Sequence, residues 1–440
     1  MSEFDLACGY RSFLKAFSTS SFWFGFFLSC IFIAPFSDKF GRKTSAAFLL
    51  ICQAITTTLT IFSPNIYFYI LFRTLSGFLV IGTSKIFVLA MELVGKRWAA
   101  STGTIVQLFQ CFGEIFCALS GEILFESWRK QALAIAVMAV ISVPFFLVLV
   151  PESPRWLISQ GRLNDAEKHL KWMAKLNCKD ASFLNLQVSN GLQPLNKKII
   201  CASSSEKGDK TINETSSLLE KEPNKKSFRK KDSLFSLFAT KYSAIFTIST
   251  AFCCLAINLI CHGIRYAVQG ISGDLVVNTC LLALTTIPGV LFIFVVEYFG
   301  RKYTLAFLFL LSAVCSFIVP LIPYSNLGGN ILIIFTMTDR CFAQAAITLF
   351  YVYASEVFPT TLRSTGLSFC IAVSRFGPFL APFINELKVG SNNLIGFFVF
   401  GACGVLGSLV LMIFGVETKG KSLISTVEQY HYRSKFKTDQ

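Results

Sequence analysis

The stretch Ser37-Asp38-Lys39-Phe40-Gly41-Arg42-Lys43 is a charged turn between two apolar segments, and it decides how the rest of the chain is interpreted. It recurs in the second half as Glu297-Tyr298-Phe299-Gly300-Arg301-Lys302. In each copy an acid ends one apolar run, a glycine permits a tight turn, and a basic pair opens the next run. A repeat at matching points of two halves is typical of a membrane carrier. Two unrelated basic loops that follow the positive-inside rule are the alternative.

The composition is that of a membrane protein with many spanning helices. Of the 440 residues, 53% are hydrophobic and only 15% are charged, and the mean hydropathy is +0.60. A soluble domain would carry about a quarter charged residues. The apolar runs are continuous and about 20 residues long, which favours helices over the alternating strands of a membrane barrel. The net charge of +15 lies mainly in loops between the runs, so it predicts orientation in the bilayer and no binding to nucleic acid.

The 15 cysteines fall mostly inside apolar runs, which predicts packing residues and no metal site or disulfide framework. The sequence shows no nucleotide-binding loop and no nucleophile-base arrangement. We therefore expect no cofactor and no enzymatic activity.

The apolar runs predict an all-α polytopic protein with eleven spans in two bundles. An N-terminal bundle over 16–150 holds five, and a C-terminal bundle over 241–416 holds six. Residues 151–240 are predicted to be a linker, with an amphipathic helix over 161–176 and then a polar stretch without regular structure. The expected spans are 16–36, 44–62, 65–91, 102–124, 131–150, 241–261, 276–297, 303–322, 329–354, 364–385 and 392–414.

The basic loops fall on alternate sides of these spans, which predicts that they are cytoplasmic. The linker and the tail over 417–440 would then lie inside the cell, with the N-terminus outside. We expect a multi-pass protein in the lipid bilayer of the plasma membrane.

Three further segments carry a family resemblance: Pro151–Gln160 (PESPRWLISQ), Ser355–Gly366 (SEVFPTTLRSTG) and Glu417–Leu423 (ETKGKSL). With the repeated turn, they resemble the major facilitator superfamily and, within it, the organic cation/anion transporter family. Sugar porters share the motifs more loosely and are the nearby alternative. The resemblance implies the major facilitator fold, in which twelve spans are usual.

Ser2–Cys8 resembles the end of the extracellular loop that follows the first span in that family. We therefore expect that the first span is missing and that residues 1–15 are a remnant of the loop. An incomplete gene model and a genuine eleven-span protein are both open explanations.

Acids near the repeated turns are predicted to form charge clusters that hold or release a cytoplasmic gate. Exposed ion pairs contribute only about 0–1 kcal/mol each, so several would have to act together. The predicted gating or structural residues are Asp38, Gly41, Arg42, Arg73, Glu92, Glu152, Arg155, Glu297, Gly300, Arg301, Arg340, Glu356, Arg363 and Glu417.

Substrate contacts are expected near mid-membrane, where ionisable groups are costly and usually functional. Arg375 falls where the resemblance places Arg in anion-handling and carnitine-type members and Asp in cation-handling ones. Its guanidinium can bind a carboxylate or sulfate, or pair with a nearby acid and hold no ligand. Lys85 is a second anion contact or snorkels to the inner interface. Glu114 is a partner for Lys85 or a protonatable group.

Two aromatic-type residues complete the candidate site. His262, at the predicted outer end of the span 241–261, stands where family members often carry tyrosines, although a lone histidine is more often a packing residue. Phe87 suits a flat aromatic substrate. The span 276–297 lacks the lysine of anion-type members, which weakens the anion assignment.

The sequence thus predicts a transporter of small organic ions, with anions or zwitterions favoured, working by alternating access. The alternatives are an organic cation carrier that uses Glu114, a sugar-porter-like carrier, and a non-transporting form that modulates a full-length partner. The sequence does not specify an oligomeric state.

Overall fold

The computed structural model describes residues 12–33, 40–94, 99–123, 127–178, 186–188, 199–201, 237–268, 273–291, 300–322, 326–358, 362–386 and 395–419. The helices of the first half are α1 Ser12–Phe32, α3 Arg42–Ile61, α4 Ile66–Leu79, α5 Ile81–Leu93, α6 Ala99–Ile123 and α7 Trp128–Leu149. Those of the second half are α10 Lys241–Ala267, α11 Leu275–Leu284, α12 Thr286–Leu291, α14 Arg301–Ile318, α15 Asn326–Val357, α16 Arg363–Ser374, α17 Phe376–Asn385 and α18 Gly396–Phe414, with a 3₁₀ turn, η6 Val319–Leu321, after α14.

These helices confirm the all-α membrane fold. Eight stretches among the described residues are long and apolar enough to cross a bilayer. Three of the predicted spans are broken, each at one residue: α4 and α5 meet at Val80, α11 and α12 at Thr285, and α16 and α17 at Arg375. The last break places Arg375 midway along its span.

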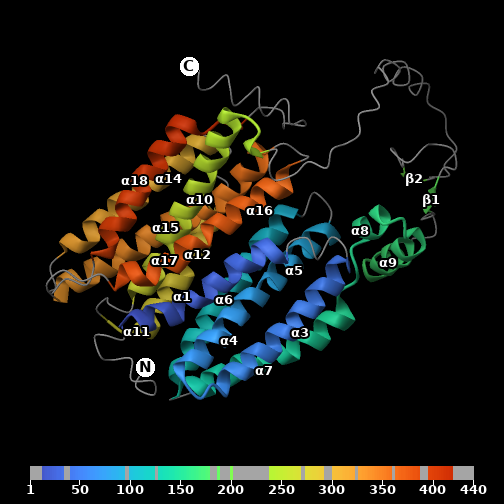
Figure 1. The fold of residues 1–440 in the computed structure, drawn as a ribbon, viewed down its shortest axis with the longest axis horizontal. Coiled ribbons are helices and arrows are strands. Elements are labelled where there is room, and N and C mark those ends of the chain that lie inside the picture. The colour runs from blue at the N-terminus through green and yellow to red at the C-terminus, as the bar shows by residue number, and fades with distance from the viewer. Residues whose placement is uncertain are drawn as a thin grey trace.

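The two halves form two bundles, drawn in blue to green and in yellow to red in Figure 1. Helix α1 of the first half packs on α17 and α16, and α6 packs on α11 and α12. The second half has a continuous core around α10, whereas the first has two smaller apolar clusters. Many large apolar side chains, such as Phe145 and Val148 on α7, point outward, as expected of surfaces that face lipid.

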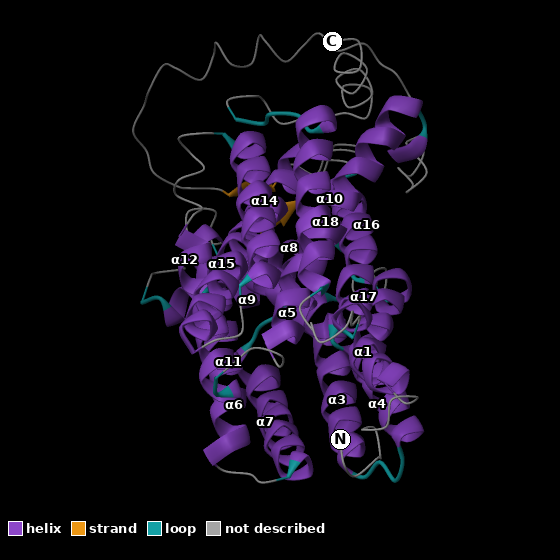
Figure 2. Ribbon diagram, turned by 90° about the vertical axis from the view of Figure 1, so that its left-hand side faces the viewer, coloured by secondary structure: helices purple, strands orange, loops and turns teal. Residues whose placement is uncertain are grey.

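The linker begins with α8 Pro154–Ser159 and α9 Leu163–Leu176, which lie beyond one end of the first bundle (Figure 1). Helix α9 confirms the predicted amphipathic helix, because Ala166 on its apolar face is fully buried. The prediction of no regular structure after it was wrong at one place. Strands β1 Leu186–Val188 and β2 Ile199–Cys201 pair antiparallel, the only orange in Figure 2.

Several predicted features lie outside the described residues. Among them are Asp38, Glu297, Cys8 and the tail from residue 420. Arg363 begins α16, but its side chain is not described.

Candidate functional site

The repeated turn builds the same helix start twice. Gly41 and Gly300 precede α3 and α14 with φ of 103° and 92°, a left-handed conformation that favours glycine. An added Cβ at Gly41 would lie 2.6 Å from the Glu152 carboxylate, and one at Gly300 would lie 3.0 Å from that of Glu417. The glycines are therefore needed for both backbone conformation and space.

The acids that lie against these glycines, Glu152 and Glu417, cap the starts of α3 and α14. Glu152 accepts a hydrogen bond from the Lys43 backbone N–H at 2.9 Å. Glu417 accepts two, from the N–H groups of Arg301 at 2.9 Å and Lys302 at 3.0 Å. Each carboxylate satisfies donors that the first turn of a helix leaves free and faces the positive end of the helix dipole. The Glu152 and Glu417 motifs are thus structurally equivalent.

The lysines of the two basic pairs, Lys43 and Lys302, also make equivalent contacts in the two halves. The Nζ of Lys43 donates to the Leu147 carbonyl at 2.8 Å, and that of Lys302 donates to the Met412 carbonyl at 2.8 Å. These bonds join α3 to α7 and α14 to α18.

Among the described residues, each half also has an ion pair at this end. Arg42 pairs with Glu92 at 3.5 Å, and Arg301 pairs with Glu356 at 2.9 Å. Both pairs join helices of the same half in this conformation. Their role in a gate between halves therefore stays a prediction. Among the other residues predicted to gate, Arg155 is exposed on α8.

Residues from both halves meet around Arg375. Its guanidinium lies over the rings of Phe26, at 4.2 Å, and Trp23, at 5.8 Å, both from α1. The ring of Trp23 lies 4.5 Å from that of His262 on α10, and its Nε1 donates to the Tyr266 hydroxyl at 2.7 Å. This cluster of Trp23, Phe26, His262, Tyr266 and Arg375 is called the central site below. A cation over aromatic rings is stabilised by the ring quadrupoles.

Further basic residues surround the central site. His262 is buried and lies within electrostatic range of Arg265, Arg340 and Arg375. Arg340 is 2% exposed and donates to the Gln344 side chain at 2.9 Å, beside the Cys261 sulfur. In the described chain, the Nε atoms of these three arginines and the Nδ1 of His262 are buried without a hydrogen-bond partner.

Lys85 and Phe87 lie on α5. Cys30 of α1 is within electrostatic range of both Lys85 and Arg375, which brings these two cations to the same region. Phe87 is 38% exposed. Arg73 on α4 has its guanidinium 5.6 Å from the Phe22 ring centroid and 5.8 Å from that of Tyr69.

Glu114 forms an ion pair with a residue that the sequence analysis did not single out. Its carboxylate accepts from Arg265 Nη2 at 2.8 and 3.0 Å, and this ion pair joins α6 to α10 across the two halves. Arg265 lies beyond the predicted end of the span 241–261 but inside α10, which continues to Ala267.

The same boundary error affected His262. Helix α10 continues to Ala267, so His262 is inside the helix and not at its end. Tyr266 lies one turn further along and takes part in the central site, so a tyrosine does occur four residues after His262. Continuing the apolar helical pattern past Cys261 would have revealed both Arg265 and Tyr266.

Asp339 is a buried acid that the sequence reasoning did not single out. It is fully buried and accepts hydrogen bonds from Ser312 and Ser316, each at 2.5 Å. The two hydroxyls from α14 therefore hold the Asp339 side chain against α14. Its position inside a predicted span was the available signal.

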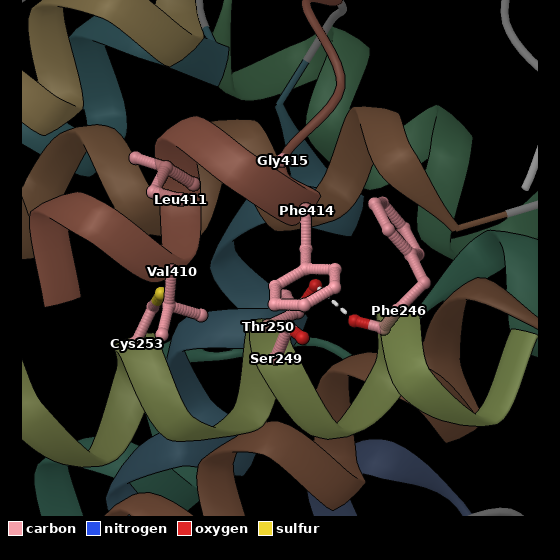
Figure 3. Close-up of a pocket in the computed structure, with 8 residues that line it drawn as sticks. All are labelled: Phe246, Ser249, Thr250, Cys253, Val410, Leu411, Phe414 and Gly415. Atoms are coloured by element: carbon pink, nitrogen blue, oxygen red, sulfur yellow. Dashed lines mark hydrogen bonds between the residues drawn. The ribbon is translucent and has the colours of Figure 1, made fainter. Parts of the chain in front are cut away.

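A small groove of about 170 Å³ lies elsewhere, between α10 and α18. Figure 3 shows that it is lined mainly by apolar side chains, with Ser249 and Thr250 among them. The hydroxyls of Ser249 and Thr250 donate to carbonyls of their own helix. The groove therefore offers no charged anchor and is not the central site.

The family model described as "Sugar (and other) transporter" matches residues 8–430. Among curated proteins, the chain is 28% identical to "Solute carrier family 22 member 15-like" of Xenopus tropicalis, covering 93% of this chain and 77% of that protein. It is 27% identical to "Organic cation/carnitine transporter 2" of Mus musculus, covering 98% and 71%.

Among solved structures, the fold matches the xylose transporter XylE from E. coli in a partially occluded inward open conformation. The TM-score is 0.66 at 19% identity, and the match covers 96% of this chain and 92% of that one. The match to XylE shows a shared fold. Together with the family model, the repeated helix starts and the two packed bundles, it establishes that this chain is a membrane transporter of the sugar (and other) transporter family, with the major facilitator fold.

Proposed function

We propose that this chain carries small organic anions or zwitterions across the plasma membrane by alternating access, with Arg375 as the charge anchor. The observation that supports this most directly is the position of Arg375. It lies at a helix break in the second half, against aromatic rings of the first half. A substrate bound there would contact both bundles, as alternating access requires.

The charge balance of this region favours an anion. Arg265, Arg340 and Arg375 lie within electrostatic range of His262, and the described acids near them are Glu114, which pairs with Arg265, and Asp339, which lies within electrostatic range of Arg340. Buried charges need partners, so a described set with more cations than acids is stabilised by an anionic ligand. An organic cation would find no free carboxylate at Glu114 in this conformation.

The aromatic residues indicate the rest of the substrate. The indole of Trp23 and the ring of Phe26 form a flat wall beside the guanidinium. Such a wall suits a ring or an acyl chain attached to an anionic group. The printed name of the relative "Organic cation/carnitine transporter 2" supports keeping zwitterions in the proposed class.

The contacts between the halves suggest the state of this conformer. Lys15 and Glu386 pair at 2.5 Å between α1 and α17, at the ends of these helices opposite to the helix starts after Gly41 and Gly300. The rings of Phe13 and Phe383 meet at 5.5 Å nearby. With the basic end of the bundles on the cytoplasmic side, as the positive-inside rule predicts, this is a conformer closed to the outside.

The test is uptake of a panel of radiolabelled organic anions, zwitterions and cations by cells that express the chain. We expect Arg375→Ala to lower anion uptake at least tenfold, because the charge partner is lost, and Arg375→Asp to shift preference toward cations. Arg162→Ala, on the exposed start of α9, is the matched control for loss of an arginine. Wild-type anion uptake by Arg375→Ala, at equal surface expression, would contradict the charge anchor.

A further inference from the structure

The ion pair between Arg265 and Glu114 is a charged contact between the halves beside the central site. Arg265 follows His262 by three residues and precedes Tyr266 directly, so it is on the part of α10 that forms the central site. Glu114 reaches it from α6 of the other half. The side chains are 30% and 23% exposed, so neither is fully buried.

The two partners of this ion pair use their hydrogen-bonding groups unequally: Glu114 uses both oxygens, whereas Arg265 uses one nitrogen. A single nitrogen, Nη2 of Arg265, donates to both Glu114 oxygens, and the Nε of Arg265 has no partner among the described residues. Arg340 adds a second positive charge within electrostatic range of the same carboxylate. A guanidinium binds a carboxylate best through two parallel N–H donors, so Arg265 has capacity for a better placed carboxylate than the one it holds.

The other contacts of Glu114 are weak. Gln110, one turn away on α6, donates to it at 3.3 Å, and the thiols of Cys111, Cys117 and Cys261 are its remaining titratable neighbours. None of these groups can replace Arg265 as a charge partner. Arg265 is the cation that hydrogen-bonds both Glu114 oxygens, so the position of this carboxylate depends mainly on Arg265.

We propose that Arg265 is a second anion-binding position, that the Glu114 carboxylate fills it in this conformer, and that a carboxylate of the substrate exchanges with Glu114. The proposal rests on the proposed function for the identity of the exchanging anion. Glu114 is then a tethered competitor. It keeps Arg265 paired while the site is empty, and it is released when substrate arrives.

The exchange has a mechanical consequence. While paired, Glu114 and Arg265 tie α6 to α10 across the two bundles. A substrate carboxylate on Arg265 removes this tie, so the bundles separate more easily when substrate is bound. Substrate binding would thereby promote the movement that carries it across.

The test is chemical rescue of stability, which needs no transport and no known substrate. The full chain is purified in detergent as wild type, Glu114→Gln, Arg265→Gln and the double variant, and Tm is measured with sodium acetate or with sodium chloride at equal ionic strength. We expect Glu114→Gln to lower Tm by several degrees and acetate to restore most of the loss. Wild type and both variants that lack Arg265 should respond to acetate and chloride alike.

Glu386→Gln is the matched control, because it breaks a second ion pair between the halves, Lys15 with Glu386. We expect acetate to add nothing beyond chloride there, since water reaches Lys15 at the end of the bundle. Glu114→Asp, whose shorter side chain reaches Arg265 less well, should show an intermediate acetate effect. It also keeps the test decisive if Glu114→Gln gives no folded protein.

An acetate effect that is equal in all variants, or absent from both Glu114→Gln and Glu114→Asp, would overturn the proposal. These outcomes are separate from those for the proposed function. Acetate rescue together with unchanged uptake by Arg375→Ala would keep the anion position at Arg265 and discard the anchor at Arg375. Loss of uptake by Arg375→Ala without acetate rescue would keep the anchor at Arg375 and discard the anion position at Arg265.

Discussion

At the residue scale, the best defined interaction is the cap that Glu417 places on α14. Burial by itself would raise the pKa of this carboxyl, but backbone N–H groups of Lys419, Arg301, Lys302 and Thr418 donate to the carboxylate and lower the pKa below its ordinary value. A carboxyl whose pKa is lowered on folding stabilises the native state above its unfolded pKa of about 4.3 and loses this effect as the pH falls through its folded pKa.

We therefore expect Glu417→Gln to cost about 1 kcal/mol of stability at pH 7, a typical value for a lost helix cap, and to cost progressively less as the pH falls below about 4. Tm of both proteins in detergent across this pH range measures the effect. Glu167→Gln is the control, because Glu167 forms an exposed pair with Lys171 that contributes about 0.2–0.5 kcal/mol. A Tm difference that stayed constant with pH would show that the ionised cap is not its cause.

The sequence identified charged residues that lie inside a continuous apolar run. Arg375 was predicted to lie mid-span, and the structure places it at a helix break beside residues of both halves. Arg265 was missed, because a hydropathy pattern does not define the end of a helix that continues through charged residues. The pairing of Glu114 depends on two helices from different halves, and no local pattern encodes that contact.

At the scale of elements, backbone geometry requires the glycine in each copy of the repeated turn, Gly41 and Gly300. We expect Gly41→Ala to destabilise the first bundle by about 2 kcal/mol, since the added Cβ combines left-handed strain with displacement of the Glu152 cap. Gly300→Ala should act in the same way on α14.

Thermal unfolding in detergent measures the loss at these two glycines. Gly103→Ala in α6 is the control, because an added Cβ there meets nothing within 4 Å. It should be neutral or slightly stabilising, since alanine favours helix more than glycine does. A wild-type Tm for Gly41→Ala would show that the turn tolerates a side chain and that the glycine has no structural role.

The elements themselves were largely predictable, because each span must satisfy its backbone internally and shows as a continuous apolar run. The breaks at Val80, Thr285 and Arg375 were not predicted, because the apolar runs continue through them. The strand pair of β1 and β2 was also missed, because three-residue strands in a polar linker leave no periodic pattern.

At the scale of the whole molecule, the two bundles must separate at the end where Lys15 meets Glu386 if the carrier is to open on that side. We expect a cross-link between Lys15→Cys and Glu386→Cys, made with a short bis-maleimide in a cysteine-free background, to abolish uptake by holding that end closed. Each single variant treated with the reagent should keep most of its uptake, because the ion pair is partly exposed and contributes about 1 kcal/mol or less.

The matched control joins positions that do not cross the halves. Arg162→Cys with Asp165→Cys bridges one turn at the start of α9, where the native side chains pair at 2.7 Å. Cross-linking there should leave uptake unchanged. Full uptake by the Lys15 and Glu386 cross-linked protein would show that this end of the bundles does not open during transport, and the rocking movement would then have to be rejected for this chain.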